Sequence, residues 1–148
     1  MLLKAKASCF ADACDLALGA PADQVLEGYL ELVPEANPWE NGFHPHVVSA
    51  VLLDKFMIGL TQIDLIPTGQ ADDELGSMDI FTDRLISWFR RPDFRCVVTG
   101  PKVDGGGEHA LAFNGGTFID PAGPQVLEEP NINIRTLWLL TLPPEVEA

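Results

Sequence analysis

The chain has 148 residues, 47% of them hydrophobic and 21% charged, which is typical of one folded domain covering residues 1–148. Its 22 acidic residues against 9 lysines and arginines give a formal net charge of −13. Such a negative surface repels phosphate backbones, so we expect no nucleic-acid partner. No apolar run approaches the roughly 18 residues of a membrane span, and no signal-peptide pattern follows the first lysines. We therefore expect a cytoplasmic protein with no membrane partner.

The front half of the chain has the periodicity of helices. Apolar residues recur three and four positions apart from Phe10 to Leu18, which predicts a helix that Gly19 and Pro21 end. A loop with a Pro-Trp pair follows at 34–45, and an acidic loop is expected at 67–76. The same helical period predicts four helices in all, at about 9–18, 22–32, 46–57 and 78–90.

The back half changes to the period of two that is typical of strands. Asn114-Gly115 between two apolar runs is a tight-hairpin signal, and simple pairing sets Asn114 against Thr117 and Ala112 against Ile119. With a weaker segment before the acidic loop, the expected strands are 60–66, 94–100, 109–114, 117–120 and 132–142. The prediction is an α+β fold, with N-terminal helices packed on a C-terminal antiparallel sheet.

Cys9 is the first candidate functional residue, because it begins the first predicted helix. The backbone N–H groups and the positive dipole end there favour a thiolate, and Lys4 and Lys6 upstream add to that effect. A nucleophilic cysteine needs a lowered pKa of this kind. The alternative is that Cys9 is a small packed residue without a role. Cys14 and Cys96 fall on apolar faces, where packing is expected.

His109 and Asp120 are the partners that such a cysteine would need. His109 opens one strand of the predicted hairpin, and Asp120 ends the other. A twist of this hairpin brings the carboxylate to the imidazole, where it can orient the ring and stabilise its cation. The plainer interpretation is that Asp120 only starts a turn. His44 and His46 could share a metal, but no third ligand lies nearby in sequence, so we expect no metal and no cofactor.

These segments resemble the papain-like cysteine peptidases, in particular their small bacterial and phage C39-like group. The run Ser8-Cys9-Phe10-Ala11-Asp12-Ala13-Cys14 looks like the nucleophile helix of that group. Glu108-His109-Ala110-Leu111 and the later Ile119-Asp120-Pro121 look like its histidine and aspartate segments. The resemblance implies a papain-like fold and hydrolysis of a peptide or amide bond, with Cys9 as nucleophile, His109 as general base and acid, and Asp120 as the orienting residue.

The chain departs from this pattern before the nucleophile. The family usually has there a glutamine whose amide donates to the oxyanion, whereas this chain has Lys4, which could take the donor's place. The alternative function is therefore an inactive papain-like module that binds a peptide or protein. Trp39 and Phe43 are candidate substrate-binding aromatics, although Trp39 could also pack under its own loop. A transglutaminase-like or amidase relative is a further alternative.

Overall fold

The computed structural model describes residues 1–3, 8–64 and 94–141, which form an α+β fold. The helices are α1 (Cys9–Leu18), α2 (Ala22–Leu32), α3 (Pro38–Asn41) and α4 (Pro45–Phe56). The strands are β1 (Gly59–Asp64), β2 (Arg95–Pro101), β3 (Glu108–Asn114), β4 (Thr117–Asp120), β5 (Gln125–Leu127) and β6 (Thr136–Thr141). The α+β class expected from the sequence is confirmed.

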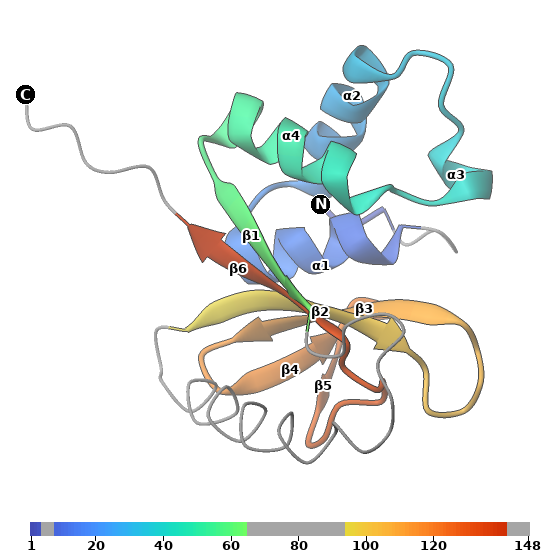
Figure 1. Ribbon diagram of the computed structural model, residues 1–148, viewed down its shortest axis with the longest axis vertical. Helices are drawn as coiled ribbons and strands as arrows, with labels where there is room; N and C mark the ends of the chain where they lie inside the picture. The colour runs from blue at the N-terminus through green and yellow to red at the C-terminus, as the bar shows by residue number, and fades with distance from the viewer. Residues whose placement is uncertain (4–7, 65–93, 142–148) are drawn as a thin grey trace, which may run out of the picture.

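The described strands form one antiparallel sheet in the order β1-β6-β2-β3-β4-β5. Helix α1 lies on this sheet against β2 and β3, and α2 and α4 cover the other side of α1 (Figure 1). The first helix is therefore enclosed between two layers. This explains why most of its side chains are buried, from Phe10 to Ala17.

The β3–β4 hairpin has the register that the sequence predicts. Asn114 pairs with Thr117, and Ala112 pairs with Ile119. The two turn residues, Gly115 and Gly116, have φ angles of 61° and 97°. A two-residue hairpin needs positive φ at its turn positions, where glycine is not strained. The local turn chemistry thus sets which residues of β3 and β4 face each other.

The predicted helices α1 and α2 are confirmed at both ends, and the αL residue Gly19 caps α1. The third predicted helix ends one residue early, because Met57 takes the left-handed conformation and Gly59 already belongs to β1. The predicted loop at 34–45 contains the short α3, which the sequence analysis missed, as it missed β5.

The last predicted strand began too early. Ile132 makes only an isolated bridge to Lys102, and β6 starts at Thr136. Residues 131–135 instead form a loop that is bonded to the end of β2 through backbone groups, including Asn133 N–H to the Pro101 carbonyl. The alternation of apolar residues in this stretch reflects burial in a loop rather than continuous strand pairing.

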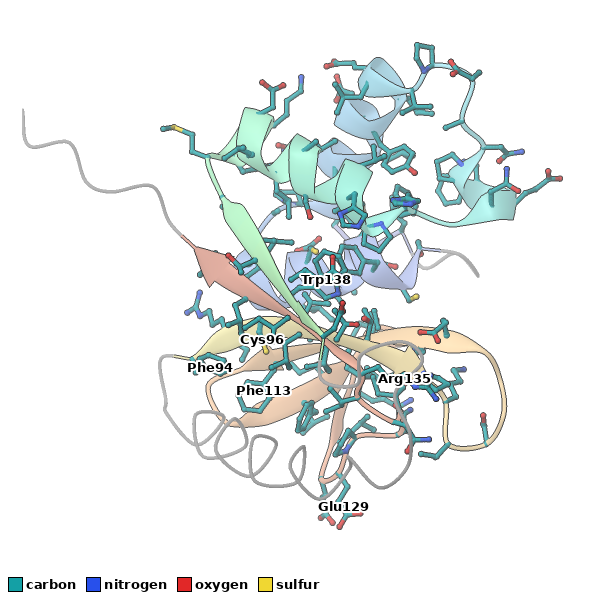
Figure 2. The ribbon with its side chains drawn as sticks, viewed as in Figure 1. Phe94, Cys96, Phe113, Glu129, Arg135 and Trp138 are labelled. Atoms are coloured by element: carbon teal, nitrogen blue, oxygen red, sulfur yellow. The ribbon has the colours of Figure 1, made fainter. Side chains whose placement is uncertain are left out.

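Two apolar clusters lie on opposite faces of the sheet (Figure 2). Trp138 faces α1 and belongs to the cluster built by the helices, together with Phe10 and Ala110. Cys96 and Phe113 lie on the other face, with Phe94 partly buried beside them. Neighbouring residues of one strand thus serve different cores, as the strand period of two requires.

Some expectations fall on residues outside the described ranges. They are the acidic loop at 67–76, the helix at 78–90, the ends of two predicted strands at 65–66 and 142, and Lys4 with Lys6. Within the described ranges, every helix is too short or too polar to cross a membrane.

Candidate active site

Cys9 is the first residue of α1, at a helix start that is held by a buried carboxylate. Asp12 is 2% exposed, and it accepts hydrogen bonds from the Ser8 hydroxyl and the Leu3 backbone N–H, each at 2.6 Å. The first backbone bond of the helix runs from Asp12 N–H to the Ser8 carbonyl. Asp12 therefore ties the segment before Cys9 to the first turn of α1.

The electrostatic surroundings of Cys9 differ from the expectation of a lowered pKa. Burial is the largest effect and raises the pKa of the Cys9 thiol above its ordinary value. Backbone N–H groups of Ala110, Phe10 and Cys9 itself act in the opposite direction, and the negative charge of Asp12 adds to the increase. The prediction of a thiolate stabilised by the helix start is therefore wrong: the resting group is the neutral thiol, because desolvation outweighs the N–H groups around it.

The hairpin register places the other two candidate residues together. His109 Nε2 lies 2.8 Å from Asp120 Oδ1, and each side chain is only 7% exposed. Asp120 lies one residue beyond the Ala112–Ile119 pair, at the strand end where β4 stops and β3 continues. The contact between His109 and Asp120 expected from the sequence is confirmed.

Asp120 is surrounded by donors. Besides His109, the Ala122 N–H donates to Oδ1 and the Asn131 side-chain amide donates to Oδ2, both at 2.9 Å. Burial raises the pKa of Asp120, but the bonds from Ala122, Asn131 and His109 together outweigh burial and leave the pKa below its ordinary value. The carboxylate is thus ionised at neutral pH.

An ionised carboxylate can only accept hydrogen bonds, which determines the tautomer of the ring. His109 must carry a proton on Nε2 in order to donate to Asp120 Oδ1. In the neutral ring the lone pair is then on Nδ1. The pair therefore provides a base at His109 Nδ1, because Nε2 is bonded to Asp120.

Cys9 and His109 line the same cavity, whose volume is about 280 Å³. Its wall is mainly apolar and comes from α1, the start of α4, β2 and β3. The lining residues are Cys9, Phe10, Phe43, Pro45, Thr99, Glu108, His109 and Ala110. Among the hydrogen bonds of the described residues, none joins the Cys9 sulfur to the His109 ring; Asp120 is the ring's partner. The nucleophile and base candidates therefore line one cavity, with no hydrogen bond between them among the described residues.

The two aromatic candidates have different positions. Phe43 is 6% exposed, lines the cavity and packs edge-to-face on Tyr29, with ring centroids 5.1 Å apart. Trp39 is 47% exposed on α3 and is not among the residues of the cavity wall. Phe43 therefore forms part of the candidate site, whereas Trp39 lies outside this cavity.

The remaining histidines and cysteines have other surroundings. His44 Nδ1 accepts the His46 backbone N–H at 3.3 Å, which caps the start of α4. No group of three or more His, Cys, Asp and Glu in the described ranges is arranged to hold a metal ion. Cys14 and Cys96 are fully buried free thiols, and burial raises the pKa of Cys96 to about 12. Packing is thus confirmed for both.

Sequence reasoning missed two residues of this site. Asn131, which lies just before the last predicted strand, donates to Asp120. Glu108 contributes the exposed carboxylate of the cavity wall. No spacing or periodicity points to Asn131, because its contact with Asp120 depends on how a loop crosses the end of the sheet. Glu108 could have been found, since it adjoins His109 in the sequence.

Comparison of the chain with protein-family models, with curated proteins and with solved structures returned no match. A functional assignment therefore depends on the geometry of these residues.

Proposed function

We propose that the protein is a papain-like thiol-dependent hydrolase that cleaves a peptide or amide bond through Cys9, His109 and Asp120. The observation that carries this proposal is the buried His109–Asp120 pair, bonded at 2.8 Å on the wall of the cavity that Cys9 also lines. A buried carboxylate–imidazole pair on the wall of a cavity that a helix-start thiol also lines is the arrangement that acyl transfer requires.

In this proposal, His109 takes the thiol proton during attack on an electrophile and not in the resting protein. The Cys9 sulfur attacks the carbonyl carbon while its proton moves to His109 Nδ1, and Asp120 stabilises the resulting imidazolium. His109 then gives that proton to the leaving amine, and a thioester remains on Cys9. Water attacks the thioester with His109 again as base, which releases the carboxylic acid and restores the thiol. The raised pKa of the Cys9 thiol favours this proton transfer during attack over a permanent ion pair.

Backbone donors at the start of α1 support the same chemistry. The N–H groups of Cys9 and Phe10 lie in the first turn, before the first helical bond at Asp12, and they act on the Cys9 sulfur. Such groups can stabilise the oxyanion that forms beside the sulfur. The further donor expected at Lys4 lies outside the described residues.

The substrate class follows from charge and cavity lining. A net charge of −13 and the Glu108 carboxylate on the wall favour a basic or neutral peptide or protein over an acidic one. The apolar surfaces of Phe43 and Pro45 suit an uncharged side chain next to the cleaved bond. The free thiols agree with a reducing compartment such as the cytoplasm, where we place the protein.

The direct test is alkylation of the native protein by iodoacetamide near pH 7, followed by intact mass. Cys14 and Cys96 are buried, so one fast adduct at Cys9 is expected. The rate at Cys9 should fall by at least about tenfold in His109→Ala, because that variant removes the base that takes the thiol proton during attack and a general base contributes ~10²–10⁴ to such reactions. His44→Ala, which removes an exposed imidazole outside the cavity wall, is the matched control and should keep the wild-type rate.

The second candidate is a papain-like binding module without turnover. Two observations favour it: burial raises the pKa of the Cys9 thiol, and no hydrogen bond within the described ranges joins that thiol to His109. If His109→Ala leaves the alkylation rate of Cys9 unchanged, the hydrolase proposal is wrong. The cavity would then be a peptide-binding pocket.

A further inference from the structure

The loop between β5 and β6 is fastened against the end of β2 near the candidate site. Val103 N–H donates to the Asn131 carbonyl at 3.1 Å, and Asn133 N–H donates to the Pro101 carbonyl at 2.8 Å. Ile132 forms a bridge to Lys102 between these two bonds. These bonds fix the position of the Asn131 backbone. Its side chain therefore contacts Asp120 from the loop between β5 and β6, not from β3 or β4.

The orientation of the Asn131 amide is determined by its neighbour. Nδ2 donates to Asp120 Oδ2 at 2.9 Å, whereas the reversed amide would set two acceptors against each other. In this orientation Oδ1 is buried and lacks a hydrogen-bond partner among the described residues. An unpaired buried oxygen destabilises the fold, so an asparagine is expected at this position only if its Nδ2 group has a role.

The two carboxylate oxygens of Asp120 thus accept hydrogen bonds from different groups. Oδ1 accepts from His109 and Ala122, and Oδ2 accepts from Asn131. His109 is the titratable group that faces this carboxylate. With Oδ2 held, the carboxylate cannot rotate without losing a bond, and Oδ1 stays directed at His109 Nε2.

We infer that Asn131 is a positioning residue of the candidate site, which holds the Asp120 carboxylate directed at His109. This inference rests on the proposed function for its catalytic meaning, but the link between Asn131 and Asp120 can be measured without substrate. Its effect on turnover is transmitted through Asp120 and then His109, since Asn131 is not part of the cavity wall.

The experiment is a pH titration of the Asp120 carboxyl carbon by ¹³C NMR, with Asp120→Asn used to assign the signal. Asn131→Ala should raise the Asp120 midpoint by about one pH unit, which corresponds to one hydrogen bond to a charged group. Asn131→Asp has nearly the same shape but replaces the donor by a second carboxylate, so it should raise the midpoint further.

Asn133 provides matched controls, because it is exposed in the same loop and its side chain has no bond to Asp120. Asn133→Ala and Asn133→Asp should leave the Asp120 midpoint near the wild-type value. Equal shifts from the two positions would show a general charge or loop effect and would overturn the inference, as would an unchanged midpoint in Asn131→Ala.

The wild-type protein gives a test that does not require any variant to fold. The Asn131 side-chain NH₂ signals should move with pH at the Asp120 midpoint, while those of Asn133 should not. Failure of this coupling overturns the role of Asn131. An unreactive Cys9 overturns only the proposed hydrolysis, so the two failures are distinguishable.

Discussion

His109 Nε2 and Asp120 Oδ1 lie 2.8 Å apart, although 11 positions separate the two residues in the chain. The β3–β4 hairpin closes this separation, and the bonds from Ala122 and Asn131 hold the carboxylate in place. Because His109 Nε2–H donates to the Asp120 carboxylate, the basic atom of the neutral ring is Nδ1. This relationship determines what chemistry the cavity can support.

Replacing Asp120 by Asn should impair this pair without changing its shape. The Asn side chain can donate to Nε2, which favours the ring tautomer with its proton on Nδ1, the wrong one for a base. If the proposed function holds, hydrolysis should fall by about 10²–10⁴-fold, and the ¹⁵N shifts of the ring should report the changed tautomer. An unchanged tautomer in Asp120→Asn would contradict the assignment.

The Asp120 carboxylate should also affect stability in acid. Its pKa in the folded protein lies below its ordinary value of 3.8, so it stabilises the fold above about pH 3.8. This contribution should be lost as the pH falls through the folded pKa, below 3.8. Urea unfolding from pH 6 to pH 2 should therefore show a smaller acid loss in Asp120→Asn than in the wild type. Parallel curves would contradict this linkage.

The Cys9 thiol should have a raised pKa in a variant that lacks the His109 imidazole. Burial raises its pKa above the ordinary value of 9.0, because the charged thiolate is desolvated. In His109→Ala, the alkylation rate of Cys9 should therefore still rise with pH above 9. The thiolate absorbance near 240 nm, measured as the difference from Cys9→Ser, gives the same midpoint independently. A midpoint below 9 would show that the N–H groups outweigh burial.

Glu108 should affect the choice of substrate charge if the proposed function holds. It is exposed on the cavity wall, where it can attract a lysine or arginine side chain of a substrate. We expect Glu108→Gln to lower the ratio of kcat/KM for a Lys-containing over a Glu-containing peptide by about 2–5-fold, the size of an exposed ion pair. Glu128→Gln, on an exposed residue outside the cavity wall, should leave the ratio unchanged.

Gly100 should not accept a side chain. It pairs with His109 across β2 and β3, and a Cβ there would lie 1.9 Å from the Asn133 backbone oxygen. Gly100→Ala must displace the loop that carries Asn131, and we expect a loss of about 1–3 kcal/mol in the free energy of unfolding. Gly106→Ala, whose Cβ would meet only side-chain atoms of Lys102 and Asp104, should cost less. Equal losses in urea unfolding would contradict the backbone clash.

Much of the local structure could be predicted from the sequence. The helical period gave the bounds of α1 and α2, and the Asn114-Gly115-Gly116 turn gave the register of β3 and β4. The His109–Asp120 contact followed from that register. These features depend on neighbours a few residues away, whose geometry is restricted by backbone sterics and by the 3.6 and 2.0 periods.

The Cys9 pKa shows where local reasoning failed. From its place at a helix start, a lowered pKa was expected, but Cys9 is partly buried against the core cluster and desolvation of the thiolate dominates. The missed β5 and the misplaced start of β6 have a related cause, since short strands and loops depend on what they pack against.

From the sequence alone came the class of fold, the bounds of the first two helices, the hairpin and the three residues of the candidate site. Only the tertiary structure decided that Cys9 and His109 share a cavity, that Glu108 and Phe43 form its wall, and that Asn131 holds Asp120. The physical reason is the range over which each effect acts along the chain. Periodicity and turn geometry act within a few residues. Burial and the meeting of distant loops instead depend on how the whole chain encloses its solvent-free interior.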